Sequence, residues 1–387
     1  MKKVVLRGPV MTQSGYGVHS RQVARWLLSK NDVDVKFMAT PWGDTPWILD
    51  KNLHDGLVGK IMDRTVGPDY KPDVSFQLQL PNEWDAKLAE KNIGITAAVE
   101  TDRSHPSWLK ACNDMDAVVF PSAHAKASVE INGEFTKPAY IVPESFCDEI
   151  MAGSQINETP VEFSTTFNFL IFGQLTGNNP FNDRKNILFT IKWLCEVFKD
   201  DPEVGIVIKT NSGRNTRIDR TLVSKILKNV LDEVRKGPYP RVHLVHGEMS
   251  DNDVSNLYRH PSIKALVSLT RGEGYGLPIL EAAASGLPVI ATNWSGHLDF
   301  LKHTKFIEID YSLFPVHQSR IDDKIFVKGA RWAEPNENDF KKKVAKFRSS
   351  SLTPREWAKE GEKKIQVVYN FSEISKLYDE KLGSFLR

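Results

Sequence analysis

Along the chain, short runs of β-branched and other apolar residues alternate with longer segments in which apolar residues recur every three or four positions. This alternation is typical of βαβ units, in which parallel strands are joined by helices that cover the sheet. A helical pattern starts near Gly17, and strands are predicted at 4–6, 33–38, 74–80, 93–99, 117–120 and 139–142. The first part of the chain therefore predicts an α/β lobe.

A second series begins after a polar stretch at 147–165, which lacks periodicity and is interpreted as a linker. Strands are predicted at 168–172, 205–209, 242–245, 265–268 and 288–291, helices at 185–198 and 221–236, and a mostly helical tail at 338–387. We therefore expect an α/β protein with two Rossmann-like lobes, at 1–150 and 165–365. Open parallel sheets bind ligands at the carboxyl ends of their strands, so a central cleft between the two lobes is expected.

The composition is that of a folded globular protein, since 41% of the 387 residues are hydrophobic and 26% are charged. The net charge is only +2, and residues 1–150 hold 17 basic and 20 acidic residues, so no bulk field points to nucleic acid or anionic lipid. No apolar stretch approaches the ~20 residues that cross a bilayer, which predicts no integral membrane association. Three widely spaced cysteines without metal-ligand spacing favour the reducing cytoplasm.

The most informative segment is 268–290, which predicts a strand, a glycine-rich loop, a helix, a turn and another strand. Pro278 suits the first helical position, where its missing amide hydrogen would be unpaired anyway. Gly272, Gly274 and Gly276 allow backbone amides to approach a ligand just before a helix N-terminus. This combination favours an anion such as a diphosphate.

Two carboxylates, Glu273 and Glu281, frame this loop with seven residues between them. A carboxylate beside a bound phosphate is unfavourable unless it accepts hydrogen bonds from hydroxyls, each contributing about 1.5–3 kcal/mol. Ribose and sugar hydroxyls are such donors, so the loop predicts a nucleotide-sugar ligand. The simpler alternative is a tight strand-to-helix turn with two solvated glutamates.

The segment resembles the Glu-x7-Glu motif of the retaining glycosyltransferases of family four, which have the GT-B fold. The resemblance covers nearly the whole chain, and the stretch from Arg7 to Trp26 looks like members carried by large tailed viruses. The last helix of the family crosses back to the N-lobe, which implies the same for 366–387. The other similar segments are Ser14-Gly15-Tyr16-Gly17, Glu100-Thr101-Asp102, Ala117-Val118-Val119-Phe120-Pro121-Ser122, Phe172-Gly173-Gln174, Arg184-Lys185-Asn186 and Trp332-Ala333-Glu334-Pro335.

The resemblance implies a role for each matching residue. Glu281 would bind the ribose hydroxyls, and Glu273 would contact the transferred sugar near the reacting carbon. Lys185, with Arg184, would balance the charge that grows on the leaving diphosphate. The other expected donor contacts are Gly15, Gly17, Lys209, Gly274, Tyr275, Gly276 and Leu277. Family members typically need no metal, so no metal site and no cofactor are expected.

The chain also departs from the family pattern. Gln174 stands where an arginine is common, so Arg184, Lys209 or Arg214 would have to replace that cation. On the acceptor side, where many members have a histidine, the predicted strand end reads Glu100-Thr101-Asp102. We expect Glu100 and Asp102 to bind the acceptor hydroxyl or transfer its proton. A helix cap or a surface turn is the alternative for both.

Several other features permit two interpretations. His19 either approaches the acceptor or caps a helix, and Lys185 is either a phosphate ligand or a solvated residue at a helix start. The basic run from Arg214 to Lys236 is interrupted by acids and favours a solvated face over a nucleic-acid patch. Three tryptophans in loop-like stretches could form an acceptor platform: Trp42, Trp47 and Trp84.

The sequence therefore predicts a retaining, metal-independent glycosyltransferase of the cytoplasm, or of the host cytoplasm if the chain is viral. It would move a hexosyl or pentosyl group from a nucleoside-diphosphate sugar to a hydroxyl of a glycan or small molecule by same-face attack. A hydroxymethylated base in viral DNA is an alternative acceptor, and such a base must be flipped out of the duplex. Two rival functions also fit the same loop, namely a nucleotide-sugar epimerase and a non-catalytic nucleotide-sugar-binding module.

Overall fold

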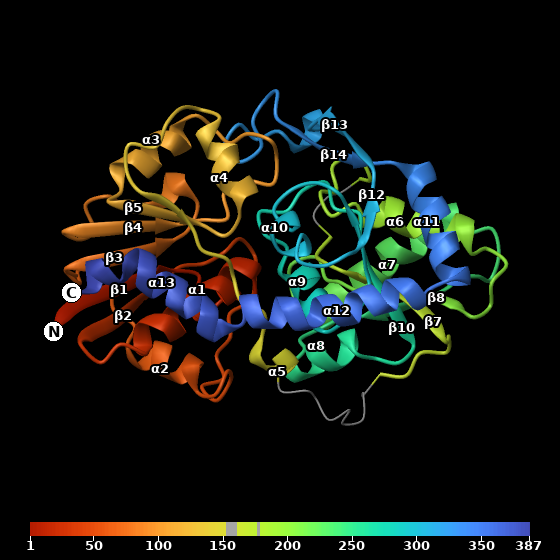
Figure 1. Ribbon diagram of the computed structural model, residues 1–387, viewed down its shortest axis with the longest axis horizontal. Coiled ribbons are helices and arrows are strands. Elements are labelled where there is room, and N and C mark those ends of the chain that lie inside the picture. Colours follow the sequence, from red (N-terminus) through yellow and green to blue (C-terminus); the bar gives the residue numbers. More distant parts are fainter. Residues whose placement is uncertain (152–160, 176–178) are drawn as a thin grey trace. The chain divides into compact units, whose positions relative to one another are not determined.

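The computed structural model describes residues 1–151, 161–175 and 179–387, which form two α/β units (Figure 1). The first unit consists of Met1–Ser145, Asp322–Val327 and Phe371–Arg387, and the second of Phe146–Ile321 and Lys328–Asn370. Each unit holds a six-stranded sheet whose strands are all parallel. The predicted two-lobed α/β class is confirmed. Of the predicted linker, residues 152–160 lie outside the described residues.

The sheet of the first unit has the strand order β2-β1-β3-β4-β5-β6. All six strands were predicted, but β3 and β4 end earlier than expected. The Ala97 amide donates to Tyr16 Oη and Ala98 is left-handed with φ +50°, so the backbone leaves the sheet after Ile95. The bounds are β1 Lys2–Gly8, β2 Val33–Ala39, β3 Val74–Leu78, β4 Lys91–Ile95, β5 Ala117–Phe120, β6 Ala139–Ile141, α1 Gly15–Leu28, α2 Leu57–Asp63, α3 Ser107–Asp114 and α4 Ala123–Glu130.

The last helix, α13 (Phe371–Leu386), belongs to the first unit and packs on α1, as the sequence predicted (Figure 1). Trp26 Nε1 donates a 2.9 Å hydrogen bond to Asp379, and the Trp26 ring stacks on Tyr378 at a centroid distance of 5.0 Å. His19 Nε2 and Tyr378 Oη share a buried 2.9 Å hydrogen bond. The α1 cap is instead Ser14, whose Oγ accepts from the Gly17 amide. His19 therefore holds α13 in place and does not cap the helix.

The sheet of the second unit has the order β12-β11-β10-β7-β8-β9. The sequence missed β12 and a separate two-stranded hairpin, because these strands have only three to five residues and the hairpin strand Tyr311–Pro315 is largely exposed. The strand bounds are β7 Phe167–Phe172, β8 Val204–Lys209, β9 Arg241–Val245, β10 Ile263–Ser268, β11 Val289–Thr292, β12 Ile307–Ile309, β13 Tyr311–Pro315 and β14 Arg331–Pro335. The helices are α5 Asp148–Met151, α6 Ile187–Val197, α7 Arg217–Val234, α8 Asp251–Tyr258, α9 Leu277–Ala284, α10 Leu298–Leu301, α11 Glu337–Ser349 and α12 Leu352–Tyr369.

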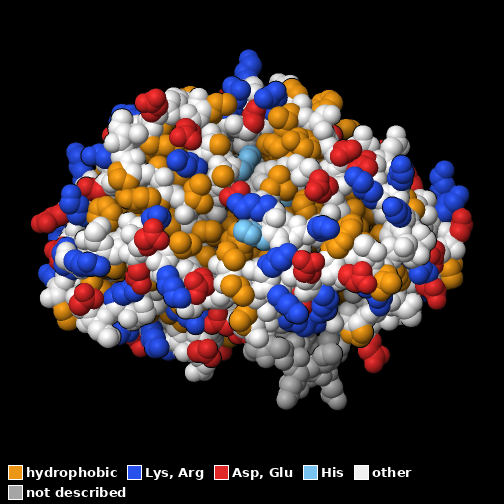
Figure 2. Space-filling view, viewed as in Figure 1, with side chains coloured by type: hydrophobic (Ala, Val, Ile, Leu, Met, Phe, Trp, Pro, Cys, Tyr) orange, Lys and Arg blue, Asp and Glu red, His pale blue; other side chains and the backbone are white. Residues whose placement is uncertain are grey.

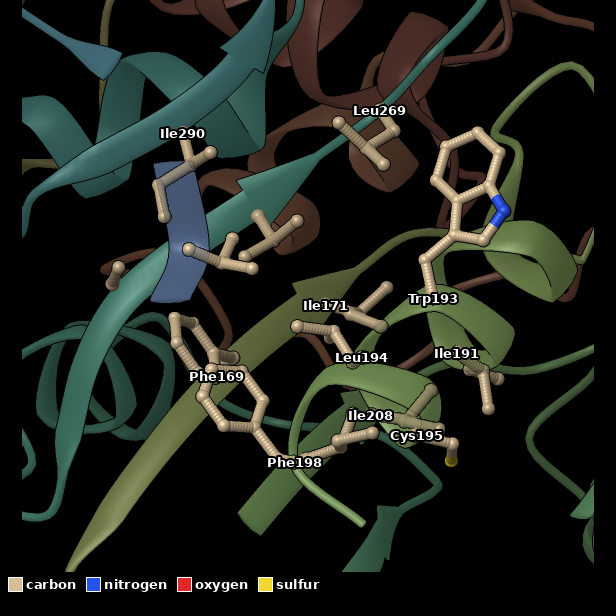
Figure 3. Close-up of a cluster of buried hydrophobic side chains, with 14 of the residues drawn as sticks. Phe169, Ile171, Ile191, Trp193, Leu194, Cys195, Phe198, Ile208, Leu269 and Ile290 are labelled. Carbon is tan, nitrogen blue, oxygen red and sulfur yellow. The ribbon is translucent and has the colours of Figure 1, made fainter. Parts of the chain in front are cut away.

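The core of the second unit lies between its sheet and α6 (Figure 3). Phe169 of β7 stacks on Phe198, just after α6, with ring centroids 5.3 Å apart. Leu194 and Ile208 are fully buried in the same cluster. Each such side chain contributes about 1.5–3 kcal/mol by leaving water. This packing fixes the carboxyl ends of β7, β8 and β10, from which the candidate site is built.

Candidate functional site

The glycine-rich loop connects β10 to α9, as predicted. Gly276 is the N-cap of α9 with φ +99°, a left-handed conformation that favours glycine, and a Cβ there would lie 3.1 Å from His297 Cβ. The helix begins at Leu277, so Pro278 occupies its second position, not the predicted first one. The Leu277 amide, like every first helical amide, has no acceptor within the helix. The loop therefore presents the positive end of a helix.

A second loop, which follows β11, packs against the glycine-rich loop and fixes its path. A Cβ at Gly296 would lie only 2.3 Å from Gly274 O, so only glycine fits there. The Glu273 amide donates to Ser295 Oγ at 2.9 Å, and the Gly296 amide donates to Glu273 O at 3.0 Å. Ser295 itself is left-handed, with φ +91°. Two bonds thus hold the backbone of Glu273.

Glu273 is buried, with 6% of its surface exposed, between two cations. Lys185 Nζ lies 2.7 Å from Oε1, and Arg184 Nη1 lies 3.3 Å from Oε2. Burial alone would raise the pKa of the carboxyl, but Lys185 and Arg184 outweigh it and lower the pKa to about 2. The structure therefore brings together Glu273, Lys185 and Arg184, and it keeps Glu273 ionised at neutral pH.

Lys185 and Arg184 do not lie on a helix, because α6 begins only at Ile187, after a left-handed Asn186. Asp183 shapes this turn, since its Oδ2 accepts from the Ile187 amide at 2.7 Å. Lys185 is thus a partly buried loop residue, and the alternative of a solvated helix start is wrong.

Arg271 is a buried support for this turn that the sequence analysis missed. It is 1% exposed and donates to Asp183 O at 2.7 Å and to both carboxylate oxygens of Glu334 at 2.8 and 2.9 Å. Its own amide donates to Arg184 O at 2.8 Å. The signal that could have found it is an arginine directly after a buried strand end, where an unpaired charge would be costly.

Glu281 lies one turn into α9 and has different surroundings. Tyr258 Oη donates to Glu281 Oε2 at 3.2 Å. Burial raises the pKa of the Glu281 carboxyl to about 8, and Asp251 and Glu149 add to the rise, while the Tyr258 hydrogen bond opposes it. At neutral pH, Glu281 is therefore mostly protonated in the structure as it stands.

Lys209 lies at the end of β8, as predicted, and its Nζ donates to Gly247 O in the loop after β9. Burial lowers the pKa of the Lys209 ammonium to about 8, against the opposing effect of Glu248. The same loop is held by His246, whose Nε2 lies 2.7 Å from Asp219 Oδ2. The basic residues on α7 are largely exposed, as both interpretations of this run require.

Four candidates belong to the first unit. A Cβ at Gly17 would lie 2.1 Å from Thr12 O, so close packing of α1 on the loop after β1 already requires this glycine, whereas Gly15 has open space. Glu100 and Asp102 lie in the loop after β4, not at the strand end, because β4 stops at Ile95. Asp102 Oδ1 lies 3.7 Å from Arg103 Nε.

The three candidate platform tryptophans separate into two groups. Trp42 stacks on Tyr16 with centroids 3.9 Å apart, and Trp47, which is 44% exposed, pairs with Thr12. Trp84 instead packs over Gly94 of β4, where a Cβ would lie 2.6 Å from its ring. Trp84 therefore covers the sheet, whereas Tyr16 and Trp42 form a stacked pair and Trp47 is exposed.

Within 1–151, 161–175 and 179–387, no group of three or more His, Cys, Asp or Glu side chains could hold a metal ion. No described helix combines the length and the hydropathy needed to span a bilayer. Cys112, Cys147 and Cys195 are free thiols.

Known proteins resemble both the fold and the loop. Residues 228–364, which include the glycine-rich loop, match the protein-family model described as glycosyl transferases group 1. A probable sucrose-phosphate synthase of Thermosipho melanesiensis is 32% identical over 127 residues, which are 32% of this chain and 27% of that protein. The chain thus matches about a quarter of the length of this curated relative.

Solved structures match over the whole chain at low identity. Anabaena HepE, in complex with UDP and glucose, has a TM-score of 0.62 and 12% identity, covering 99% of this chain and 100% of that one. Sucrose-phosphate synthase from Thermosynechococcus elongatus has a TM-score of 0.61 and 13% identity with the same coverage. The chain therefore has the GT-B fold, and its second unit carries the group 1 glycosyltransferase match.

Proposed function

We propose that the protein is a retaining glycosyltransferase that moves a sugar from a nucleoside-diphosphate sugar to a hydroxyl acceptor, without a metal ion. The second unit would bind the donor and the first unit the acceptor. The observation that carries the proposal is Glu273, buried and ionised between Lys185 and Arg184 next to a glycine-rich helix start. The comparison with Anabaena HepE, solved with UDP and glucose, supports a nucleotide-sugar donor.

The donor would fit this site in a defined order. The diphosphate would lie at the amino end of α9, near the backbone of Gly274, Tyr275, Gly276 and Leu277. Its charge would compete with Glu273 for Lys185 and Arg184, and Glu273 would then accept hydrogen bonds from the sugar hydroxyls. Glu281 would bind the ribose diol, and Lys209 would add positive charge on the neighbouring side of the sheet.

The proposed reaction needs no group beyond the donor and the acceptor. The acceptor oxygen would attack the anomeric carbon on the face from which the diphosphate leaves. The acceptor proton would pass to a leaving phosphate oxygen, and the bond from the anomeric carbon to that phosphate would break. Lys185 and Arg184 would lower the barrier because they are already placed where negative charge grows. Glu100 and Asp102 would position the acceptor hydroxyl.

For the acceptor, we propose a glycan or a small hydroxylated molecule. The exposed Trp47 ring suits the apolar face of a sugar ring, and the stacked Tyr16 and Trp42 would be further aromatic contacts. On the face that Figure 2 shows, Lys and Arg side chains are interspersed with Asp and Glu, which gives no broad basic track for a DNA backbone. A gel shift on hydroxymethylated DNA that weakened steeply with salt would contradict this choice.

The test of the function is a titration of UDP and UDP-glucose into the protein, followed by an assay of donor hydrolysis and transfer to a sugar panel. We expect both nucleotides to bind and NMR of the product to show the anomeric configuration of the donor. Absence of binding across a panel of nucleoside diphosphates would overturn the donor site. Conversion of the donor without an acceptor to an epimeric nucleotide sugar would identify an epimerase.

A further inference from the structure

A cavity of about 350 Å³ lies in the second unit, at the amino ends of β10 and β11. Its walls come from the start of β10 at Ile263, the turn after α9 at Ser285 and Gly286, and the end of α8 at Tyr258. The loop that holds Glu273 follows the carboxyl end of β10, so the cavity lies at the opposite edge of the same sheet. Its volume lies in the range of small-ligand sites, about 300–1,000 Å³.

The cavity is lined by four cations from two segments of the chain, 258–264 and α12: Arg259, Lys264, Arg355 and Lys359. Burial lowers the pKa of the Lys264 ammonium, and the charge of Arg355 lowers it further, so these two cations repel each other. Lys264 Nζ donates to the carbonyl of Pro261. Among the residues that the structure describes, no carboxylate pairs with the side chain of Lys264 or Arg355.

One nearby carboxylate offsets only part of this charge. Glu362 Oε2 lies 3.1 Å from Lys359 Nζ, and Glu362 Oε1 lies 3.8 Å from Arg259 Nη2. Lys264 is partly buried and Arg355 is exposed, and an anion between them would offset both charges.

We propose that this cavity is an anion site that binds a small soluble phosphate ester, separate from the proposed donor site. Several cations around one cavity match the charge and the oxygens of a phosphate dianion, and the Arg355 guanidinium suits phosphate oxygens in particular. This proposal rests only on the residues that line the cavity, so it does not depend on the proposed catalytic function. Tyr258 lines it and also donates to Glu281, so an occupant would touch a residue that contacts the proposed ribose ligand.

The experiment titrates inorganic phosphate and glycerol 3-phosphate into the protein at constant ionic strength, by calorimetry and thermal shift. The background is Lys185→Ala, which removes a cation of the donor site. We expect binding in this background and at least a tenfold loss in Lys264→Glu/Arg355→Glu. The matched control, Lys225→Glu/Lys228→Glu, reverses two exposed charges on α7 and should bind as the parent does.

Lys264→Gln keeps the proposal testable if the charge reversal impairs folding. Without phosphate, this variant should be as stable as the parent or slightly more so, because the repulsion between Lys264 and Arg355 is removed. With phosphate, its thermal shift should be clearly smaller. Equal binding by the parent and the double reversal variant would overturn the proposal. So would binding to phosphatidylglycerol vesicles without binding of either soluble phosphate, because a lipid headgroup would then be the ligand.

Discussion

Glu273 and Glu281 are residues of the same type, eight positions apart, but their surroundings give them opposite ionisation states at neutral pH. Glu273 lies between two cations that lower its pKa to about 2, whereas Glu281 is buried near Asp251 and Glu149, with its pKa raised to about 8. Glu273 therefore keeps its negative charge at neutral pH. The Glu281 carboxyl ionises there only when a bound partner favours its charged form. The motif spacing alone does not distinguish them, because the difference comes from residues elsewhere in the chain.

The largest expected effect comes from removing the charge of Glu273, which lies between Lys185 and Arg184. Glu273→Gln should lower kcat by about a thousandfold, because the charge that would face the sugar and that orders Lys185 is lost. Affinity for UDP should rise, because the diphosphate would no longer compete with Glu273 for Lys185 and Arg184. The measurement is steady-state transfer from UDP-glucose together with calorimetric titration of UDP. Glu356→Gln, on the exposed side of α12, is the control, and an unchanged kcat in Glu273→Gln would exclude Glu273 from the reaction.

The next prediction concerns Arg271, which supports the turn that carries Arg184 and Lys185. Arg271→Met should lower the free energy of unfolding by about 3–5 kcal/mol, because it breaks a buried ion pair with Glu334 and leaves the Asp183 carbonyl without this donor. Urea denaturation of the variant gives this difference. Arg220→Met removes an exposed arginine from α7 and should change stability by less than about 0.5 kcal/mol. A loss in Arg271→Met no larger than in this control would show that the buried network is not a support.

The raised pKa of Glu281 should make nucleotide binding depend on pH. Ribose hydroxyls favour the ionised form of Glu281, so binding lowers its pKa and releases a proton. Affinity for UDP should therefore rise about tenfold from pH 6.5 to pH 8.5, as the free carboxyl ionises around its pKa of about 8. Calorimetry in buffers of different ionisation enthalpy measures the released proton. Glu281→Gln should show weak binding with no such rise; an identical rise in this variant would assign the proton to another group.

The smallest effect is expected from Tyr258→Phe. The hydroxyl of Tyr258 stabilises the ionised form of Glu281, so its removal should move the pH midpoint of UDP binding upward. Affinity at pH 7 should fall about twofold to threefold, while affinity at pH 9 stays nearly constant. Tyr239→Phe, in the segment between α7 and β9, is the control. A midpoint that moved downward would show that the hydrogen bond does not stabilise the carboxylate.

The fold was predictable from the sequence where the physics is local. Strands such as Ala117–Phe120 are continuous apolar runs between turn residues, and their burial follows from that pattern. The hairpin at Tyr311–Pro315 has no such pattern, because both its faces are largely exposed. The end of β4 at Ile95 was missed for a different reason, since it depends on a hydroxyl from Tyr16, some eighty residues away in sequence.

The candidate site was predictable in its residue types but not in its electrostatics. The glycines and the two glutamates of the loop could be read directly, because their chemistry is local to the segment. The pairing of Glu273 with Lys185 depends on a left-handed Asn186 and on buried Arg271, and the high pKa of Glu281 depends on α8 and α5. Such effects arise from tertiary packing, which a single sequence does not display.

The division of the first unit into three stretches of sequence affects how the protein is made. The second unit reaches its last residue at Asn370, whereas the first unit still lacks Phe371–Arg387 at that moment. Tyr378 and Asp379, the partners of His19 and Trp26, are therefore synthesised some 350 codons after those residues. Because the first unit is built from three separated stretches, no single proteolytic cut can excise either unit intact.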